Sequence, residues 1–239
     1  MLIAFVATLV RSTFGFGEAM VAVPLLAFIL PLTVATPLAV LLSVTVALIV
    51  VVQDHQSIHV RSAMWLLAAT LPGLGVGLLL LRAGHQTELK AALGVVILGI
   101  SAITLSGRMT SHPRFEARGW TVVFGFCAGV LGGAFGMNGP ALAIYGALRR
   151  WPPQEFRATL QAYFLPASVL GLIGFGAVGI WAPSVTHYYL LSLPVTVPAV
   201  FVGRAINRRL RGDSFRKYVF VGLAGIGLLL LARSLRSLF

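Results

Sequence analysis

One carboxylate stands alone within an apolar stretch of the chain. Glu18 follows the glycine-containing run Phe14–Gly17, and the other acidic side chains lie in polar loops. A charge at the centre of a membrane helix costs about 2.5–3.5 kcal/mol on insertion scales, so a lone membrane carboxylate is a candidate functional group. Burial favours its neutral form, and Glu18 could therefore carry a proton that is coupled to solute movement. A structural role is equally open, because the helix dipole stabilises a carboxylate in the first helical turn and Glu18 could pair with Arg11.

Two glycine-rich breaks interrupt the apolar sequence, Phe14–Gly17 and Gly132–Asn138. Each break has short apolar pieces on both sides, which are Met1–Thr13, Glu18–Leu30, Trp120–Leu131 and Gly139–Leu148. About thirteen residues of α-helix reach roughly 20 Å, which is less than the thickness of a hydrocarbon core. We therefore expect a discontinuous or re-entrant helix at each break, with Pro140 in the first turn of the later piece.

Helices that begin inside a membrane can bind anions. Their first N–H groups have no intrahelical partner and lie at the positive end of the helix dipole. Two such ends are expected near Gly17–Ala19 and Asn138–Pro140, where glycines allow a ligand to approach the backbone. The candidate substrate-binding residues are Gly15, Gly17, Glu18, Gly136, Asn138, Gly139 and, on the next helix, Gln161. The alternative is that the glycines only allow helices to pack closely.

The two breaks introduce similar halves. The run Phe14–Val23 has a counterpart 121 residues later at Phe135–Ile144, and three long apolar segments follow in each half. Pro72 and Pro194 correspond at an offset of 122 residues. This order predicts a single transmembrane domain over residues 1–239, with internal repeats at about 1–107 and 119–239. Each repeat would open with a broken or re-entrant helix and continue with three transmembrane helices.

The composition supports a membrane location. The chain is 58% hydrophobic and only 10% charged, whereas soluble domains are about 25% charged. The stretches Val34–Val52, Ser62–Leu81 and Ser184–Gly203 contain no charged residue, and each is long enough to cross a bilayer as a helix. Backbone polar groups must be paired in lipid, so the sequence predicts an all-α polytopic helical bundle.

The basic residues indicate an orientation. The net charge of +12 reflects Lys and Arg at helix ends, and no basic stripe interleaved with aromatics suggests nucleic-acid binding. If each broken element crosses the membrane once, the repeats are parallel and the 18 basic residues divide 11 to 7 between the two sides. If it turns back, the second repeat is inverted and they divide 13 to 5, which the positive-inside rule favours. The smaller group would be Arg11, Arg82, Lys90, Arg233 and Arg236. The positive-inside rule then places both termini outside the cytoplasm of a cell inner membrane or plasma membrane.

No enzyme motif is present. The sequence lacks a His-Glu-x-x-His pair, a P-loop and a Gly-x-Ser-x-Gly elbow. Cys127 is the single cysteine, so no intramolecular disulfide can form. We expect no catalytic residue, metal site or cofactor.

Around the breaks the chain resembles the TauE/SafE family, the sulfite exporter or 4-toluene sulfonate uptake permease family. The residues that carry the resemblance are Arg11–Leu26, which contain Phe14-Gly15-Phe16-Gly17 and Pro24-Leu25-Leu26, and Gly132–Pro140 in the second half. The resemblance implies seven or eight membrane helices in a plasma membrane and transport of sulfite or organosulfur anions. The commoner family pattern has a glycine where Glu18 stands, and this difference bears on which anion is carried.

Together these patterns predict a secondary transporter for a small anion, sulfite or another organosulfur anion, with Glu18 as the residue for proton coupling. Its partners would be this anion and the lipid bilayer, and a homo-oligomer is left open. The alternative is a membrane scaffold or assembly factor without transport activity. The two differ in whether the space between Gly17 and Asn138 is a polar cavity or is filled with side chains.

Overall fold

A computed structural model describes the chain except for residues 15–16, 54–59, 107–117, 150–152, 210–212 and 237–239. The described residues form helices and contain no strand, as the all-α prediction requires. The helices are α1 Leu2–Phe14, α2 Glu18–Leu26, α3 Leu32–Gln53, α4 Val60–Ala83, α5 Gln86–Ser106, α6 Arg118–Phe135, α7 Gly139–Leu148, α8 Pro153–Ala177, α9 Pro183–Arg209 and α10 Asp213–Arg236.

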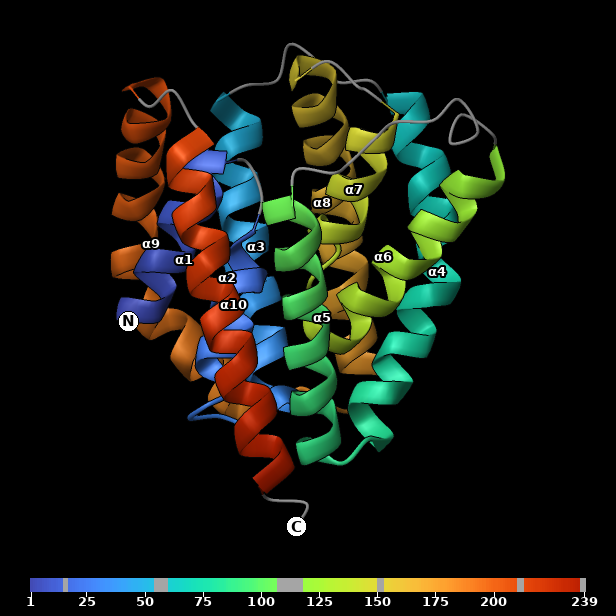
Figure 1. Cartoon of the computed structure of the whole chain (residues 1–239), viewed down its shortest axis with the longest axis vertical. Coiled ribbons are helices and arrows are strands. Elements are labelled where there is room, and N and C mark those ends of the chain that lie inside the picture. The colour runs from blue at the N-terminus through green and yellow to red at the C-terminus, as the bar shows by residue number, and fades with distance from the viewer. Residues whose placement is uncertain (15–16, 54–59, 107–117, 150–152, 210–212, 237–239) are drawn as a thin grey trace.

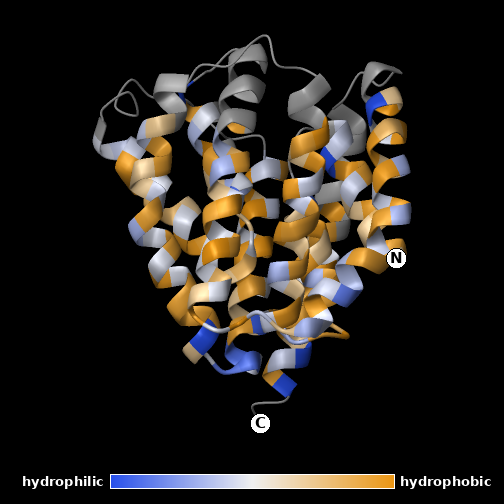
Figure 2. Ribbon diagram, turned by 180° about the vertical axis from the view of Figure 1, so that it is seen from behind, coloured by the Kyte–Doolittle hydropathy of each residue, from blue (hydrophilic) through white to orange (hydrophobic). Residues whose placement is uncertain are grey.

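The outside of the bundle is apolar at mid-height. Among the described residues, four segments are long and apolar enough to cross a membrane, Leu32–Ile49, Met64–Ala83, Gln86–Ser106 and Pro183–Ile206. Large hydrophobic side chains such as Trp65, Ile173 and Leu229 are exposed on the surface of the bundle. Figure 2 shows hydrophobic residues over its middle and hydrophilic residues gathered toward the end that carries the C-terminus. Lipid is the medium that such a surface requires, and the protein is a membrane protein.

Both predicted breaks are present, and one is shorter than expected. The first lies between the end of α1 at Phe14 and the start of α2 at Glu18, and its Gly17, the N-cap of α2, has a φ of 101°. The second was predicted to begin at Gly132, but α6 continues to Phe135 and the backbone turns only at Gly136, where φ is 66°. Gly132 and Gly133 are helical, and the space of their missing side chains is taken by close neighbours, Asn138 and the backbone of α4.

The helices pack in pairs that join the two halves of the chain. α3 packs against α8, α5 against α10, α1 against α9, and α4 against both α6 and α8. In Figure 1 α3 and α5 run upward, whereas α8 and α10 run downward. α4 likewise runs downward and α9 upward. α3 and α8 are therefore central elements that contact neighbours from both halves.

Glycines bring the backbones of α4 and α6 into direct contact. A Cβ on Gly77 would overlap with the carbonyl oxygen of Val130, and a Cβ on Gly129 with that of Thr70. Thr70 Oγ1 also donates a hydrogen bond to the Gly125 carbonyl at 3.0 Å. Small residues at intervals of four allow this approach, and van der Waals packing then holds the helices together in lipid.

A methyl group added at Gly77 should therefore separate α4 from α6. We expect Gly77→Ala to destabilise the protein by about 1–3 kcal/mol, as overpacking does in other cores. The thermal unfolding midpoint in detergent should fall by several degrees. Gly75→Ala is the matched control on the same helix, because nothing lies within 4 Å of a Cβ at Gly75. Equal midpoints for the two variants would contradict this account of the interface.

Candidate anion-binding site at the helix breaks

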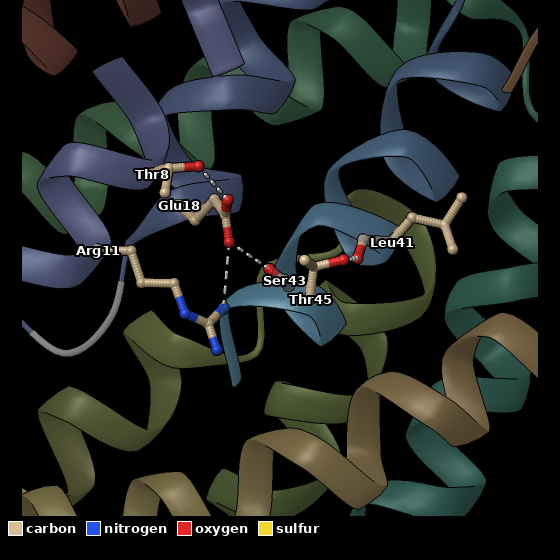
Figure 3. Close-up of polar contacts among 6 residues, drawn as sticks. All are labelled: Thr8, Arg11, Glu18, Leu41, Ser43 and Thr45. Atoms are coloured by element: carbon tan, nitrogen blue, oxygen red, sulfur yellow. Dashed lines mark hydrogen bonds and ion pairs between the residues drawn. The ribbon is translucent and has the colours of Figure 1, made fainter. Parts of the chain in front are cut away.

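Glu18 is the first residue of α2 and is buried, with 1% of its surface exposed. Thr8 Oγ1 donates a hydrogen bond to Oε1 at 2.8 Å, and Ser43 Oγ donates one to Oε2 at 3.1 Å. Arg11 Nη1 also donates to Oε2, at 3.4 Å. Figure 3 shows these three side chains converging on the carboxylate from two helices, α1 and α3. The pairing with Arg11 that the sequence left open is thus present.

The local fold explains this convergence. Thr8 and Arg11 are three residues apart on α1 and so lie on the same face of that helix. The turn at Gly17 folds α2 back along α1, which brings Glu18 against that face. Ser43 lies near the middle of α3, so the carboxylate is far from both ends of that helix. The first break therefore places a charged pair deep in the bundle.

Arg11 was not among the predicted site residues. Its position in the sequence grouped it with the interfacial basic residues, but the structure leaves only 5% of its surface exposed. Its guanidinium carbon lies 5.5 Å from the centroid of the Phe164 ring on α8. One feature of the sequence could have indicated that Arg11 is buried. It lies on the short apolar piece that leads into the first break, whereas an interfacial arginine would be expected next to a long polar loop.

Asn138 lies at the second break, directly before the start of α7. It is largely buried, and its Nδ2 donates to the Tyr163 hydroxyl at 3.4 Å. The Tyr163 hydroxyl in turn lies 2.8 Å from Thr70 Oγ1 on α4. The Asn138 side chain lies against Gly132, where a Cβ would be only 2.8 Å from the amide atoms. Gly136 packs similarly against Val40 of α3.

The two breaks contact the same pair of central helices. On α8, Tyr163 bonds Asn138 and the next residue, Phe164, lies under Arg11. The two rings meet edge to face with centroids 5.8 Å apart. On α3, Ser43 bonds Glu18, and Thr36 Oγ1 donates to the Ala134 carbonyl at 3.4 Å just before the second break. α3 and α8 thus connect the two sites that the sequence singled out.

The predicted residues divide into three groups. Gly17, Glu18, Gly136, Asn138 and Gly139 lie at the breaks, as expected. Gly15 lies outside the described residues, and Gln161 lies on α8 with a side chain outside the described part. The N-cap of α2 is Gly17, which has no side chain with which to cap the first N–H groups of the helix. Within the described residues no group of three or more His, Cys, Asp or Glu could hold a metal ion.

A cavity of about 170 Å³ lies away from the breaks. It is formed where α2 ends, α5 begins and α10 ends, and its lining residues are Ala27, Phe28, Gln86, Thr87, Lys90, Leu230, Arg233 and Ser234. None of the predicted site residues lines it. The site at the breaks is therefore defined by its polar contacts and not by this cavity.

Comparison with known proteins gives the family. Residues 1–230 match the family described as "Sulfite exporter TauE/SafE". A similar curated protein is the "Probable sulfite/organosulfonate exporter TauE" of Cupriavidus necator, which is 27% identical over 227 residues, covering 92% of this chain and 88% of that protein. No solved structure matches the chain. The match extends over nearly the whole sequence, so the expectation of a transporter and not an enzyme is confirmed, and the chain belongs to the TauE/SafE family of membrane transporters.

Proposed function

We propose that this protein is a multi-pass secondary transporter that moves a small organosulfur anion, sulfite or a sulfonate, across the cell inner membrane or plasma membrane. The observation that carries the proposal is the buried ion pair Arg11–Glu18 at a helix break deep in the bundle. Ionisable residues inside a membrane are costly and typically mark a substrate or proton pathway. The related exporter from C. necator supplies the class of substrate.

The helix starts at the two breaks are the proposed anion contacts. α2 begins at Glu18 without a side-chain cap, and α7 begins at Gly139 beside the Asn138 amide. Discontinuous helices in secondary transporters direct such ends at substrate near the bilayer midplane. The residues proposed to form the substrate site remain Gly15, Gly17, Glu18, Gly136, Asn138, Gly139 and Gln161, with Glu18 as the group whose charge controls entry of the anion.

We further propose that residues of about 1–107 and 119–239 form two inverted repeats within one domain. The packing supports this, because contacts between helices recur when each helix is replaced by its counterpart in the other half. α1 packs on α9 and its proposed counterpart α6 packs on α4, while α3–α9 contacts correspond to α8–α4 contacts. The opposite directions of α3 and α8, and of α5 and α10, also support inversion.

Proton coupling through Glu18 is the proposed mechanism. The carboxylate receives hydrogen bonds from Thr8 and Ser43, and Arg11 is the charged group that faces it among the described residues. From α8 the neighbour of this pair is Phe164, which has no titratable group. Two further charged residues lie on helices that pack on α2, Lys90 on α5 and Arg233 on α10. Both line the cavity at the C-terminal end of α2, the end opposite to Glu18. Protonation of Glu18 would remove the negative charge that repels an anion near α2.

Glu18→Gln should abolish the pH dependence of transport. The amide keeps the size of the side chain but cannot exchange a proton. Flux of methanesulfonate into proteoliposomes is the suitable measurement, because a sulfonate keeps its charge over the tested pH range. Glu88→Gln is the matched control, since Glu88 is exposed in the first turn of α5. A Glu18→Gln variant with the pH profile of the wild type would sink the coupling mechanism.

Asn138→Asp should weaken anion binding while keeping the shape of the side chain. A carboxylate at the second break would repel a sulfonate, and we expect the apparent affinity to fall at least about tenfold, or ~1.4 kcal/mol. The measurement is the substrate concentration that gives half-maximal flux. Gln86→Glu makes the same chemical change at the far end of α2, and it should have a much smaller effect. A protein that carries no organosulfur anion in any of these assays would fit the scaffold alternative.

The proposed orientation places the C-terminus outside the cytoplasm. Alkaline phosphatase fused to the C-terminus should be active, because this enzyme matures only outside the cytoplasm. Green fluorescent protein fused to the same terminus should not fluoresce, because it does not fold when it is exported unfolded. Fusions after Ser106, the last residue of α5, should give the opposite result. A fluorescent C-terminal fusion would reverse the orientation proposed from the positive-inside rule.

A further inference from the structure

We infer that Arg11 is the side chain that binds the transported anion, and that Glu18 is an internal counter-ion which the anion replaces. The inference rests on the proposed transport function and identifies a ligand for the substrate within it. Arg11 lies outside the residues that the sequence assigned to the site. The hydrogen bonds of Arg11 and Glu18 are unequal in number and length.

The guanidinium group of Arg11 is under-used. A guanidinium has five N–H donors in a planar fork. Its one hydrogen bond within the described structure is Nη1 to Glu18 Oε2 at 3.4 Å, longer than the roughly 2.7–2.9 Å of a strong charge-assisted bond. Nη2 is buried and has no hydrogen-bond partner among the described residues. An unsatisfied buried donor is unfavourable, so this atom needs an acceptor that the described protein does not provide.

The carboxylate of Glu18 is in the opposite situation. Thr8 and Ser43 donate to its two oxygens at 2.8 and 3.1 Å, both shorter than the bond from Arg11. If Arg11 turned to another anion, Glu18 would keep a hydrogen bond at each oxygen. The two neutral donors would then partly compensate Glu18 for the loss of Arg11, while Nη2 of Arg11 would gain the acceptor that it lacks. This imbalance is what an internal counter-ion would show.

The position of Arg11 suits a ligand shared by both halves. It lies in the last turn of α1, and Figure 3 shows one guanidinium nitrogen joined to Glu18 while another points away from the carboxylate. The guanidinium group lies over Phe164 of α8, and the adjacent Tyr163 holds the Asn138 amide of the second break. An anion bound at Nη2 of Arg11 would thus lie between α1 and α8, the helix whose Tyr163 contacts Asn138.

The chemistry of the fork selects the ligand class. A planar guanidinium binds oxyanions through two parallel N–H···O bonds, which sulfite and sulfonates can accept. A neutral sulfonamide of the same shape lacks the charge that would compete with Glu18. The site should therefore distinguish methanesulfonate from methanesulfonamide by charge alone.

The test measures binding of methanesulfonate and sulfite to the purified full chain in nanodiscs by calorimetry, with methanesulfonamide as the neutral control. Glu18→Gln should bind methanesulfonate about tenfold more tightly, because the internal competitor is gone. The paired variant Arg11→Gln with Glu18→Gln should bind at least about tenfold more weakly than the wild type. The pair is removed together because a single buried charge left without its partner destabilises a protein. Arg82→Gln, at the exposed end of α4, is the matched control and should bind as the wild type does.

The outcomes separate the two proposals. A wild-type protein that neither binds nor transports any organosulfur anion would overturn the proposed function. A wild-type protein that binds methanesulfonate with the same affinity as the paired variant would overturn the role of Arg11 and leave transport intact. Weaker binding by Glu18→Gln would also overturn the inference, because it would make Glu18 a ligand and not a competitor. Thermal unfolding of each variant without ligand should show a cooperative transition, which checks that both Glu18→Gln and the paired variant are folded.

Discussion

A helix that stops inside a membrane leaves backbone N–H and C=O groups without partners, and lipid cannot supply them. Both breaks of this protein therefore have to lie where other parts of the chain surround them. α3 and α8 meet this requirement, since Ser43 and Thr36 reach the two breaks from one helix and Phe164 and Tyr163 from the other. The rest of the bundle can be understood as what holds these two helices and the broken elements together in lipid.

Glycine packing performs much of that work. Hydrophobic burial gives little drive for helices to associate in lipid, so close backbone contact has to replace it. The α4–α6 contact depends on glycines from both helices, and α5 and α10 meet at Gly94 and Gly227. Close packing of the outer pairs leaves large side chains such as Trp65 and Leu229 to face lipid. Close packing is thus one of the two uses of glycine weighed from the sequence, and the other, contact with an anion, is proposed only for the glycines at the breaks.

The sequence was sufficient for those features that follow from local composition. Uncharged runs located the long helices, and clustered glycines located both breaks, because length and backbone freedom act over a few residues. It placed the end of α6 too early because Gly132 and Gly133 look like a break but serve close packing against Asn138 and α4. It could not give the partners Thr8, Ser43 and Phe164, since these meet only after the chain folds back. The pairing of Glu18 with Arg11 was one of two alternatives and is present, but the burial of Arg11 was not expected, because a basic residue near a helix end looks interfacial until the chain folds back.

The two proposed repeats divide the chemistry between them. At the offset of 121 residues, Thr8 and Arg11 of the first half correspond to Gly129 and Gly132 of the second. Where the first half has a polar pair around Glu18, the second therefore has glycines that bring α6 against α4 and make room for Asn138. The pair Gly17-Glu18 likewise corresponds to Asn138-Gly139, so the first break contributes the charges and the second a neutral amide. In the proposed site a single arginine would then serve both halves. If both repeats carried a copy of Arg11 and Glu18, four charges would have to be buried deep in the bundle, and burying them would cost more than one pair does.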